Sequence, residues 1–489
     1  MQDVQAVFDR LSANTYALAR TTAAQRAARI TALMASLLSR KELAFEAGRA
    51  ELGLSETDVI GQVIIIKAEA DFALKHIAEW VKPKRVPNSI MMLGKKAYIQ
   101  YEPKGVVLNL STWNAPLAIG LVPAIAAIAA GNAVLLKPSE LAPQSAGLLR
   151  DIVAEAFPDN EFAVVEGGPE VAEALLALPF NHMYYTGGQK VGRIVMRAAA
   201  EHFAGVTLEM GGKNPVFVDD SADITDAARK IAWGRLSNAG QVCIAPDYVL
   251  VEKSVETKFL ETIAAEIPKM YNADGKGFEN SGDFPRVINQ THFARVQSLI
   301  DDAISKGARA ILGGASNPAS RFIPPTILTG VNDSMRVMQE EIFGPVLPVM
   351  AYDDLEAAMA RVRARPKPLA LYVYAKDRGV IDAVLAGTSA GSTVINHNMV
   401  QSGTNPHLPF GGVNGSGIGR VGGHQGFLEF SNARSVVEET KAADGLTPLP
   451  PFDDKTRKMM AGMLGRSTVV PAPIIGAIQT VLAVRAMFK

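Results

Sequence analysis

Cysteine is almost absent from this chain: Cys243 is the only one in 489 residues. A single cysteine excludes a disulfide within the chain and any metal site built from a cysteine cluster. It also agrees with a reducing compartment. Small residues, Asn238, Ala239 and Gly240, precede Cys243 and leave room for an incoming molecule. Cys243 is therefore either a buried filler, the common use of a free cysteine, or a nucleophile.

Excess charge of either sign is also missing. The chain has 49 basic residues (lysine plus arginine) and 49 acidic residues (aspartate plus glutamate). It therefore has no excess of basic residues for binding nucleic acid and no acidic tail. The N-terminus lacks the basic-then-apolar order of a signal peptide. We expect a cytoplasmic protein whose partner is a small molecule.

One long uncharged run lies in the C-terminal tail. Ser467 to Val484 carries no charge, but Pro471, Pro473 and Gln479 interrupt it. We expect a helix packed on the protein body or on a dimer partner, and peripheral membrane contact is the less favoured alternative.

The composition, 48% apolar and 20% charged with 42 glycines, is typical of an α/β protein of two or three domains. Helical periodicity predicts helices over 23–38, 43–52 and 58–81. Apolar strands and helices then alternate over 106–185 and again over 214–374, which predicts two doubly wound parallel sheets. The glycine-rich stretch 411–426 is expected to be an ordered loop.

One candidate cofactor site is the turn from Tyr185 to Gly192, between an apolar strand and a helix. Glycines at such a turn let the backbone approach a pyrophosphate at the helix N-terminus. The spacing of Gly187 and Gly192 is not the common dinucleotide fingerprint, so a plain tight turn is an equally good interpretation.

Three charged candidates lie at or just after the ends of two apolar strands. Lys137 and Glu140 lie where parallel sheets bind nucleotides, and a carboxylate there can accept both ribose hydroxyls. The alternative is a solvated helix start. Glu209 precedes Gly211 and Gly212, and partial burial would raise its pKa and suit it to take a proton from water. The alternative is a carboxylate exposed at a strand end.

Five separated segments together resemble the signature segments of the aldehyde dehydrogenase superfamily, over about residues 10–440. They are Trp113-Asn114-Ala115-Pro116, Leu208-Glu209-Met210-Gly211-Gly212-Lys213, Gly240-Gln241-Val242-Cys243, Glu340-Glu341-Ile342-Phe343-Gly344-Pro345-Val346 and Leu408-Pro409-Phe410-Gly411-Gly412-Val413. The stretches 241–248 and 424–427 resemble the branch that acts on coniferyl, aromatic and fatty aldehydes.

The resemblance implies a covalent mechanism. Cys243 attacks the aldehyde, and the Asn114 amide and the Cys243 backbone N–H stabilise the oxyanion. After hydride transfer to the nicotinamide, Glu209 activates the water that hydrolyses the thioester. The implied cofactor is NAD, with NADP tolerated, and the implied cofactor contacts are Trp113, Lys137, Glu140, Gly187, Gly192, Glu341 and Phe343.

The resemblance also implies a domain plan and a homodimer. The cofactor domain comprises 1–83 and 104–208, the catalytic domain 209–397, and a small β oligomerisation element with the C-terminal loop 84–103 and 398–445, followed by the tail 446–489. No metal is implied.

Some positions depart from the family pattern. Ala115 stands where an aromatic residue often lines the substrate tunnel, so the tunnel should be wider and should suit bulky aldehydes. Asn414 replaces a usual glycine, and Gly422 and Gly423 replace bulkier residues. Two other functions stay open: acyl transfer to coenzyme A, which needs no general base, and a catalytically silent paralogue.

Overall fold

The computed structural model describes residues 3–89, 92, 94–401, 405–439 and 448–464, with 474, 477, 478, 480 and 481. The chain divides into two compact units. One comprises Met1–Ile77 and Pro103–Phe430, and the other comprises Ala78–Glu102 and Ser431–Lys489. Both large sheets fall in the first unit, so the predicted domain boundary at 208/209 stays a prediction.

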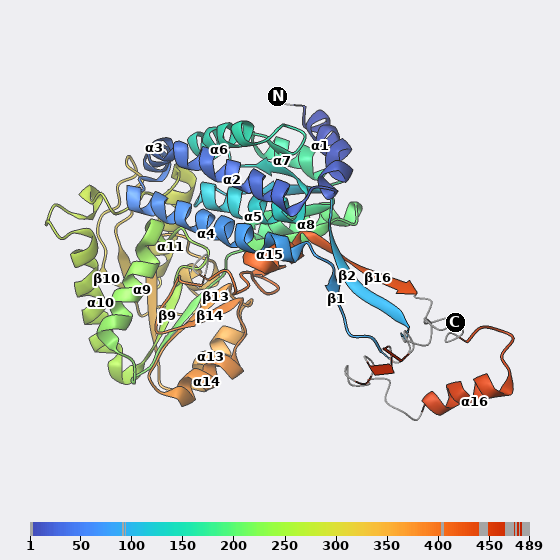
Figure 1. The fold of residues 1–489 in the computed structure, drawn as a ribbon. Helices are drawn as coiled ribbons and strands as arrows, with labels where there is room; N and C mark the ends of the chain where they lie inside the picture. Colours follow the sequence, from blue (N-terminus) through green and yellow to red (C-terminus); the bar gives the residue numbers. More distant parts are fainter. Residues whose placement is uncertain are drawn as a thin grey trace. The chain divides into compact units, whose positions relative to one another are not determined.

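Four helices open the chain: α1 (Val4–Ala19), α2 (Ala23–Ser39), α3 (Lys41–Leu52) and α4 (Glu56–Trp80). The periodicity predicted the last three, and α1 was not predicted. A capping box fixes the start of α2, because the Thr22 side chain accepts from the Gln25 N–H and Gln25 accepts from the Thr22 N–H. The apolar face of α2 packs beside α5 and α6 (Figure 1).

The first sheet has six strands in the order β15-β7-β6-β3-β4-β5. Its strands are β3 (Val106–Leu110), β4 (Ala133–Lys137), β5 (Phe162–Val164), β6 (His182–Gly187), β7 (Gly205–Met210) and β15 (Gly417–Ile418). The connecting helices are α5 (Pro116–Ala130), α6 (Pro143–Ala156), α7 (Pro169–Leu176) and α8 (Gln189–Glu201). All neighbours pair in parallel except β15, which is antiparallel to β7.

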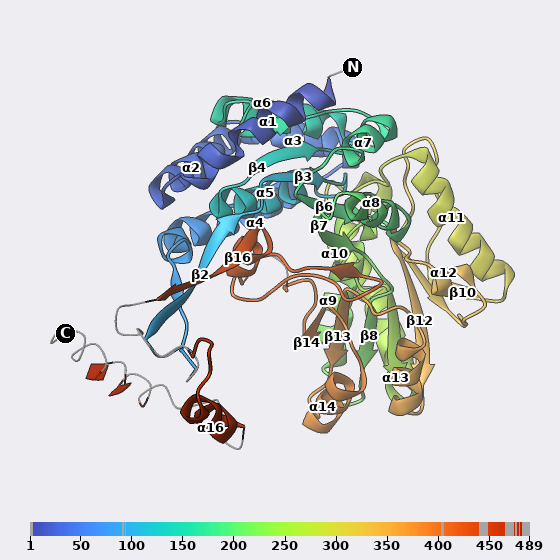
Figure 2. The same ribbon diagram turned by 90° about the vertical axis from the view of Figure 1, so that its right-hand side faces the viewer.

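The second sheet has seven strands in the order β10-β11-β12-β9-β8-β13-β14. Figure 2 shows β14, β13, β8 and β12 of this sheet. Its strands are β8 (Pro215–Val218), β9 (Tyr248–Glu252), β10 (Arg309–Leu312), β11 (Thr326–Thr329), β12 (Val346–Tyr352), β13 (Ala370–Tyr374) and β14 (Ser392–Ile395). The helices are α9 (Ile224–Leu236), α10 (Glu256–Tyr271), α11 (Gln290–Ser305), α12 (Arg336–Gln339), α13 (Leu355–Arg363) and α14 (Arg378–Gly387). Among the described strands of this sheet, only β10 runs antiparallel to its neighbour.

Both faces of this second sheet are buried. Phe217 and Leu250 belong to one apolar cluster, whereas Val216 and Val249 belong to another. Alternate residues of one strand point to opposite faces, so a strand with two covered faces is apolar throughout. The two mostly parallel sheets confirm the predicted α/β class.

The stretch 411–426 is not wholly a loop, because it contains β15 and the start of α15 (Gly423–Glu429). The pairing of β15 with β7 brings Gly417 opposite Glu209. This stretch therefore lies against the strand that carries a candidate catalytic residue.

The second unit contains a three-stranded sheet in the order β1-β2-β16. Its elements are β1 (Lys84–Arg85), β2 (Lys95–Pro103), β16 (Ser431–Glu439) and the helix α16 (Asp454–Met463). Most of the uncharged segment Ser467 to Val484 lies outside the described residues, so the expectation of a packed helix there stays a prediction. Among the described residues, no helix has the length and apolar character needed to span a membrane.

Candidate active site

A cavity of about 280 Å³ brings together residues from distant parts of the chain. Its predicted site residues are Trp113, Asn114, Gly187, Glu209, Cys243, Glu341 and Phe343. They come from the loop after β3, the ends of β6 and β7, the turn after α9 and the loop before β12. Loops beyond the carboxyl ends of parallel strands meet at one edge of a sheet, which is where α/β proteins bind ligands.

Cys243 lies in a strained turn between α9 and β9. Asn238, Ala239 and Gly240 all have positive φ angles, of 49°, 51° and 75°. A Cβ on Gly240 would lie 2.2 Å from the Gly344 carbonyl oxygen, so only glycine fits there. The Asn214 amide donates to the carbonyls of Cys243 at 2.8 Å and Ala245 at 3.0 Å and holds the turn in place.

Burial, and next the charges of Glu341 and Glu209, raise the pKa of the half-buried Cys243 thiol to about 12. The backbone N–H groups of Cys243 and Ile244 act in the opposite direction. The thiol of the free protein is therefore protonated at neutral pH.

Asn114 is tied directly to this turn. Its side-chain amide donates to the Gln241 carbonyl at 2.9 Å, and the Asn238 amide donates to the Asn114 carbonyl at 2.8 Å. An amide group has two N–H donors, so one remains for a ligand oxygen. The structure thus joins the Asn114 and Cys243 segments, which are far apart in the sequence.

Glu209 ends β7 with only 5% of its surface exposed. Both of its carboxylate oxygens are buried, and neither has a hydrogen-bond partner among the described residues. Burial raises its pKa well above the ordinary value, and the nearby charge of Glu429 adds to this, whereas Arg420 opposes it. The Glu209 carboxylate is therefore buried, as expected. The alternative, a carboxylate exposed to water at a strand end, is wrong.

The two glycines after Glu209 make room for Glu341. A Cβ on Gly211 would lie 2.0 Å from a Glu341 carboxylate oxygen, and the Gly212 N–H donates a hydrogen bond to this carboxylate. Burial, and next the charge of Asp247, raise the pKa of Glu341 to about 8. Phe343 has a left-handed φ of 46° and meets Trp113 edge-on, with ring centroids 5.5 Å apart.

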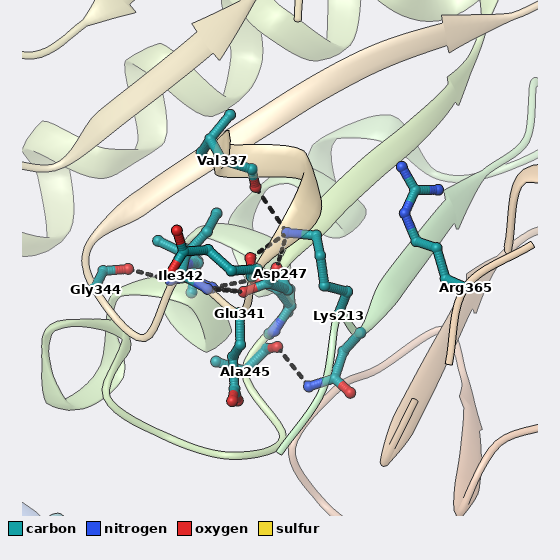
Figure 3. Close-up of polar contacts among 12 residues, drawn as sticks. Lys213, Ala245, Asp247, Val337, Glu341, Ile342, Gly344 and Arg365 are labelled. Carbon is teal, nitrogen blue, oxygen red and sulfur yellow. Dashed lines mark hydrogen bonds and ion pairs between the residues drawn. The ribbon is translucent and has the colours of Figure 1, made fainter. Parts of the chain in front are cut away.

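A buried ion cluster connects the loops that carry Cys243 and Glu341 (Figure 3). Asp247 forms ion pairs with both Lys213 and Arg235 and accepts from the Ile342 N–H at 3.1 Å. Lys213 also donates to the Val337 carbonyl at 2.8 Å, and Arg235 donates to the Gly344 carbonyl. Nothing in the local sequence around Asp247, Lys213 and Arg235 indicates that they meet, so these positioning residues were not predicted.

The remaining predicted residues lie outside this cavity. Gly192 packs α8 closely on β7, since a Cβ there would lie 2.6 Å from Met210 Sδ, and it lines a separate cavity with Met196 and Ile418. Buried Lys137 forms an ion pair with the more exposed Glu140 at 3.0 Å. Ala115 is half-buried at the N-cap of α5 and is not among the residues lining the 280 Å³ cavity.

The cavity is also lined by residues that have no role predicted from the sequence: Thr112, Ile119, Thr186, Gly188, Gly211, His292 and Arg295. The Thr186 hydroxyl and His292 Nδ1 are buried without a hydrogen-bond partner among the described residues. Thr186 was within the glycine-containing segment 185–192, whereas His292 and Arg295 come from α11, which carries no local signal of a site. Among the described residues, no group of three or more His, Cys, Asp or Glu side chains could hold a metal ion.

The residues present fit a nicotinamide cofactor. Gly187, with φ of 155°, and Gly188 leave the strand-to-helix turn open to a close ligand. The unpaired Thr186 and His292 atoms supply polar partners in the same cavity.

Comparisons with known proteins agree with the site. The putative aldehyde dehydrogenase AldX of Bacillus subtilis is 38% identical over 439 residues, 89% of this chain and 97% of the relative. A probable coniferyl aldehyde dehydrogenase of Caulobacter vibrioides is 39% identical over 423 residues, 84% of this chain and 85% of the relative. The 4,4'-diaponeurosporen-aldehyde dehydrogenase of Staphylococcus aureus is 37% identical over 417 residues, 85% of this chain and 89% of the relative.

A solved structure of Staphylococcus aureus AldH in a substrate-bound state has a TM-score of 0.89 at 34% identity and covers 95% of this chain and 100% of its own. Residues 1–436 match the aldehyde dehydrogenase family. This protein therefore belongs to that family and is an oxidoreductase that acts on aldehydes with NAD(P).

Proposed function

We propose that this enzyme oxidises bulky aldehydes to carboxylic acids, with Cys243 as nucleophile, Asn114 as oxyanion donor and Glu209 as hydrolytic base. One observation carries the proposal: these three side chains, from three distant segments, line a single cavity.

The chemistry assigned to each residue follows from its surroundings. The Cys243 thiol, with its pKa raised to about 12, has to lose its proton before or during attack on the carbonyl carbon. The free N–H of Asn114 and the Cys243 backbone N–H then stabilise the charge on the former carbonyl oxygen. NAD(P), when bound, accepts a hydride from the resulting thiohemiacetal carbon.

Glu209 serves in the second half of the reaction. Its carboxylate has no partner among the described residues, so it has room in its hydrogen bonding for a water molecule once a small shift of the side chain opens it to the cavity. Removal of a proton from that water makes it a nucleophile for the thioester carbon. A CoA-acylating enzyme needs no such base, so the burial of Glu209 in this cavity disfavours acyl transfer to coenzyme A.

For the cofactor we propose that Trp113, Lys137, Glu140, Gly187, Gly192, Glu341 and Phe343 are contacts and that NAD is preferred over NADP. The carboxylate of Glu140 would accept ribose hydroxyls and repel a 2′-phosphate. Lys137 forms an ion pair with Glu140, so its ammonium group would lie near a 2′-phosphate at the same ribose and could pair with it. NADP would therefore be tolerated.

For the substrate we propose aromatic aldehydes, such as coniferyl aldehyde, or aliphatic aldehydes of medium or long chain. Ala115 leaves space at the position after Asn114 that an aromatic residue often fills in the family. The names of the relatives from Caulobacter vibrioides and Staphylococcus aureus, coniferyl and 4,4'-diaponeurosporen-aldehyde dehydrogenase, support bulky substrates.

We also propose a cytoplasmic homodimer, because the lone catalytic thiol needs a reducing compartment and β16 offers an edge for pairing with a second chain. Contact of the tail with a membrane surface stays the less favoured alternative.

The test is a spectrophotometric assay of NADH formation with cinnamaldehyde, decanal and propanal, with and without coenzyme A. We expect turnover without coenzyme A and a higher kcat/KM for the two larger aldehydes. Cys243→Ala should abolish turnover, and Ala115→Tyr should reduce kcat/KM for the larger aldehydes and spare propanal. Activity of the alanine variant, or a strict need for coenzyme A, would contradict the proposal.

A further inference from the structure

A chain of polar side chains crosses the first sheet beside Glu209. Lys104, just before β3, contacts His182 of β6, with 3.1 Å between Nζ and Nδ1. His182 Nε2 in turn lies 2.8 Å from Thr207 Oγ1 on β7. The chain ends at Glu429, the last residue of α15, whose Oε1 accepts from the Thr207 hydroxyl at 2.7 Å. His182 and Thr207 are fully buried, whereas the two charged ends are half-buried.

The protons of this chain have one consistent arrangement. A lysine ammonium can only donate, so His182 Nδ1 is its acceptor and Nε2 carries the proton of a neutral ring. Burial, and next the charge of Lys104, lower the pKa of His182 well below its ordinary value, which agrees with a neutral ring. His182 Nε2–H then donates to the Thr207 oxygen, and the Thr207 hydroxyl donates to Glu429. Every donor therefore points toward Glu429 and favours its anionic form.

Two glycines make room for the chain. A Cβ on Gly205 would lie 2.5 Å from His182 Nδ1. A Cβ on Gly419 would lie 2.8 Å from Glu429 Oε1 and 2.9 Å from Thr207 Cγ2. A side chain at either position would displace one of these contacts, so the backbone is built around both ends of the chain.

Thr207 places the Glu429 carboxylate next to the proposed base. Thr207 and Glu209 are two residues apart on β7, so their side chains lie on the same face of the sheet, about 6–7 Å apart. The pairing of Gly417 with Glu209 brings the segment that leads to Glu429 against the same strand. Burial is the main cause of the raised pKa of Glu209; Arg420 opposes it, and the charge of Glu429 adds to it.

Two other ionisable groups near Glu209 are neutral. They are Tyr184 on β6 and the Cys243 thiol on the turn before β9. Burial is the main cause that raises the pKa of Tyr184 well above its ordinary value and that of Cys243 to about 12. Neither group carries charge at neutral pH, so neither opposes the ionisation of Glu209 there.

Three further groups can carry charge near the two carboxylates. Arg420 opposes the effect of Glu429, and its guanidinium is held by two carbonyls of its own loop. Glu341 lines the same cavity, and burial raises its pKa to about 8. Burial lowers the pKa of Lys104, whereas the charge of Glu429 raises it, so the two ends of the chain stabilise each other. A substitution at Glu429 leaves these three groups in place, so a comparison with wild type isolates the Glu429 charge.

We propose that Glu429 is a positioning residue for hydrolysis: its carboxylate, held by the chain from Lys104, acts through Glu209 and sets the pH at which the thioester is hydrolysed. This inference rests on the proposed function of Glu209 and adds a residue to the same site. An anion beside a general base favours proton uptake from water, because the protonated base is the neutral form.

A single-turnover experiment measures hydrolysis directly. Excess enzyme and NAD are mixed with cinnamaldehyde, and rapid quench with mass spectrometry follows the rise and decay of the Cys243 thioester from weakly acidic to alkaline pH. Glu429→Gln keeps an oxygen that accepts from Thr207 but removes the charge. Because the anion no longer opposes the ionisation of Glu209, we expect the midpoint of the pH–rate profile for thioester decay to fall by about one pH unit.

Further variants test the charge and the chain separately. Glu429→Asp keeps the charge, so its midpoint should lie closer to wild type than to Glu429→Gln. Thr207→Val removes the hydroxyl that holds Glu429, and the freed carboxylate turns toward solvent, where its charge is screened. We expect its midpoint to shift in the same direction as in Glu429→Gln, whereas Thr207→Ser keeps the hydroxyl and should not shift. Thr207→Val also decides the matter if Glu429→Gln does not fold.

The NADH burst separates this role from a purely structural one. Hydride transfer precedes the step assigned to Glu209, so the burst rate of Glu429→Gln should stay within about two-fold of wild type. A residue that only supports the fold would slow the burst and the hydrolysis alike and leave the midpoint unchanged. That result would overturn the inference.

Glu209→Gln completes the comparison. If it stalls as the thioester while Glu429→Gln and Thr207→Val leave the midpoint of hydrolysis unchanged, the inference is overturned and the proposed function stands. If Glu209→Gln hydrolyses the thioester as wild type does, the proposed role of Glu209 fails. The inference then fails with it, because Glu429 has no base to act through.

Discussion

The acidity of Cys243 is set by its neighbours. Its pKa is raised to about 12 by burial and then by Glu341, whose own pKa is raised to about 8. The rate of alkylation of the free enzyme by iodoacetamide should therefore keep rising up to at least pH 10. An exposed cysteine would level off near its ordinary pKa of about 8.5.

The variant Glu341→Gln tests whether the charge of Glu341 slows the alkylation of Cys243. Below pH 8 the Glu341 carboxyl is largely neutral, so the variant should react like wild type. Above pH 8 its negative charge opposes the thiolate, so removal of that charge should speed alkylation. Glu340→Gln, a more exposed neighbour that pairs with Arg336, is the control and should leave the profile unchanged. A plateau near pH 8.5 in wild type would contradict the assigned environment.

Glu209 should act after hydride transfer. Glu209→Gln should produce a burst of one NADH per site and then stall as the thioester, with the steady-state rate lower by about 10²–10⁴-fold. Because burial raises the Glu209 pKa, the carboxylate fraction increases with pH, and thioester hydrolysis in wild type should accelerate in the same direction. Stopped-flow absorbance measures both the NADH burst of the variant and the pH dependence of the wild-type rate. A variant without a burst would mean that Glu209 acts before or during hydride transfer.

Glu140 should decide between the two cofactors. In Glu140→Gln the Lys137 ammonium loses its carboxylate partner and becomes free to pair with a 2′-phosphate. We expect the ratio of kcat/KM for NADP to that for NAD to rise about ten-fold, the effect of one charge-assisted hydrogen bond. An unchanged ratio would remove Glu140 from the ribose site.

At the scale of elements, the loops that form the site are held by the cluster of Asp247, Lys213 and Arg235. Asp247→Asn leaves two buried cations without their shared carboxylate and should lower the free energy of unfolding by about 3–5 kcal/mol. Urea denaturation measures this change. Asp382→Asn removes an exposed partner of Arg378 and should change stability by no more than about 1 kcal/mol. Equal losses of unfolding free energy in both variants would contradict the conclusion that the Asp247 cluster holds these loops together.

At the scale of the whole molecule, β16 is an edge strand of the β1-β2-β16 sheet, and most of its residues are exposed. Such an edge pairs readily with another chain. We expect wild type to sediment as a dimer. Backbone N–H groups of adjacent strand residues point to opposite edges of the strand. In either Val436→Pro or Val437→Pro, proline therefore removes an N–H that points away from β2, toward the free edge of the sheet. We expect that variant to be monomeric. Val437→Thr is the control, and a monomeric wild type would rule out the homodimer.

Much of this architecture could be predicted from local patterns. The apolar strands β3, β4 and β6 and the capped helix α2 follow from hydrophobic periodicity, which depends only on near neighbours. Strands β10, β11 and β14 were not predicted. β10 and β14 are too exposed to show an apolar run, and β11 has threonine at both ends, which leaves only two consecutive apolar residues.

The sequence by itself determined the fold class, the family and the segments that carry Asn114, Glu209 and Cys243, because motif spacing and local periodicity are properties of the chain. Only the tertiary structure decided which side chains meet. The ion pairs of Asp247 with Lys213 and Arg235, and the unpaired carboxylate of Glu209, depend on contacts between residues tens to hundreds of positions apart. Burial and charge at such contacts set the pKa values and unsatisfied polar atoms of the site, and no local pattern encodes them.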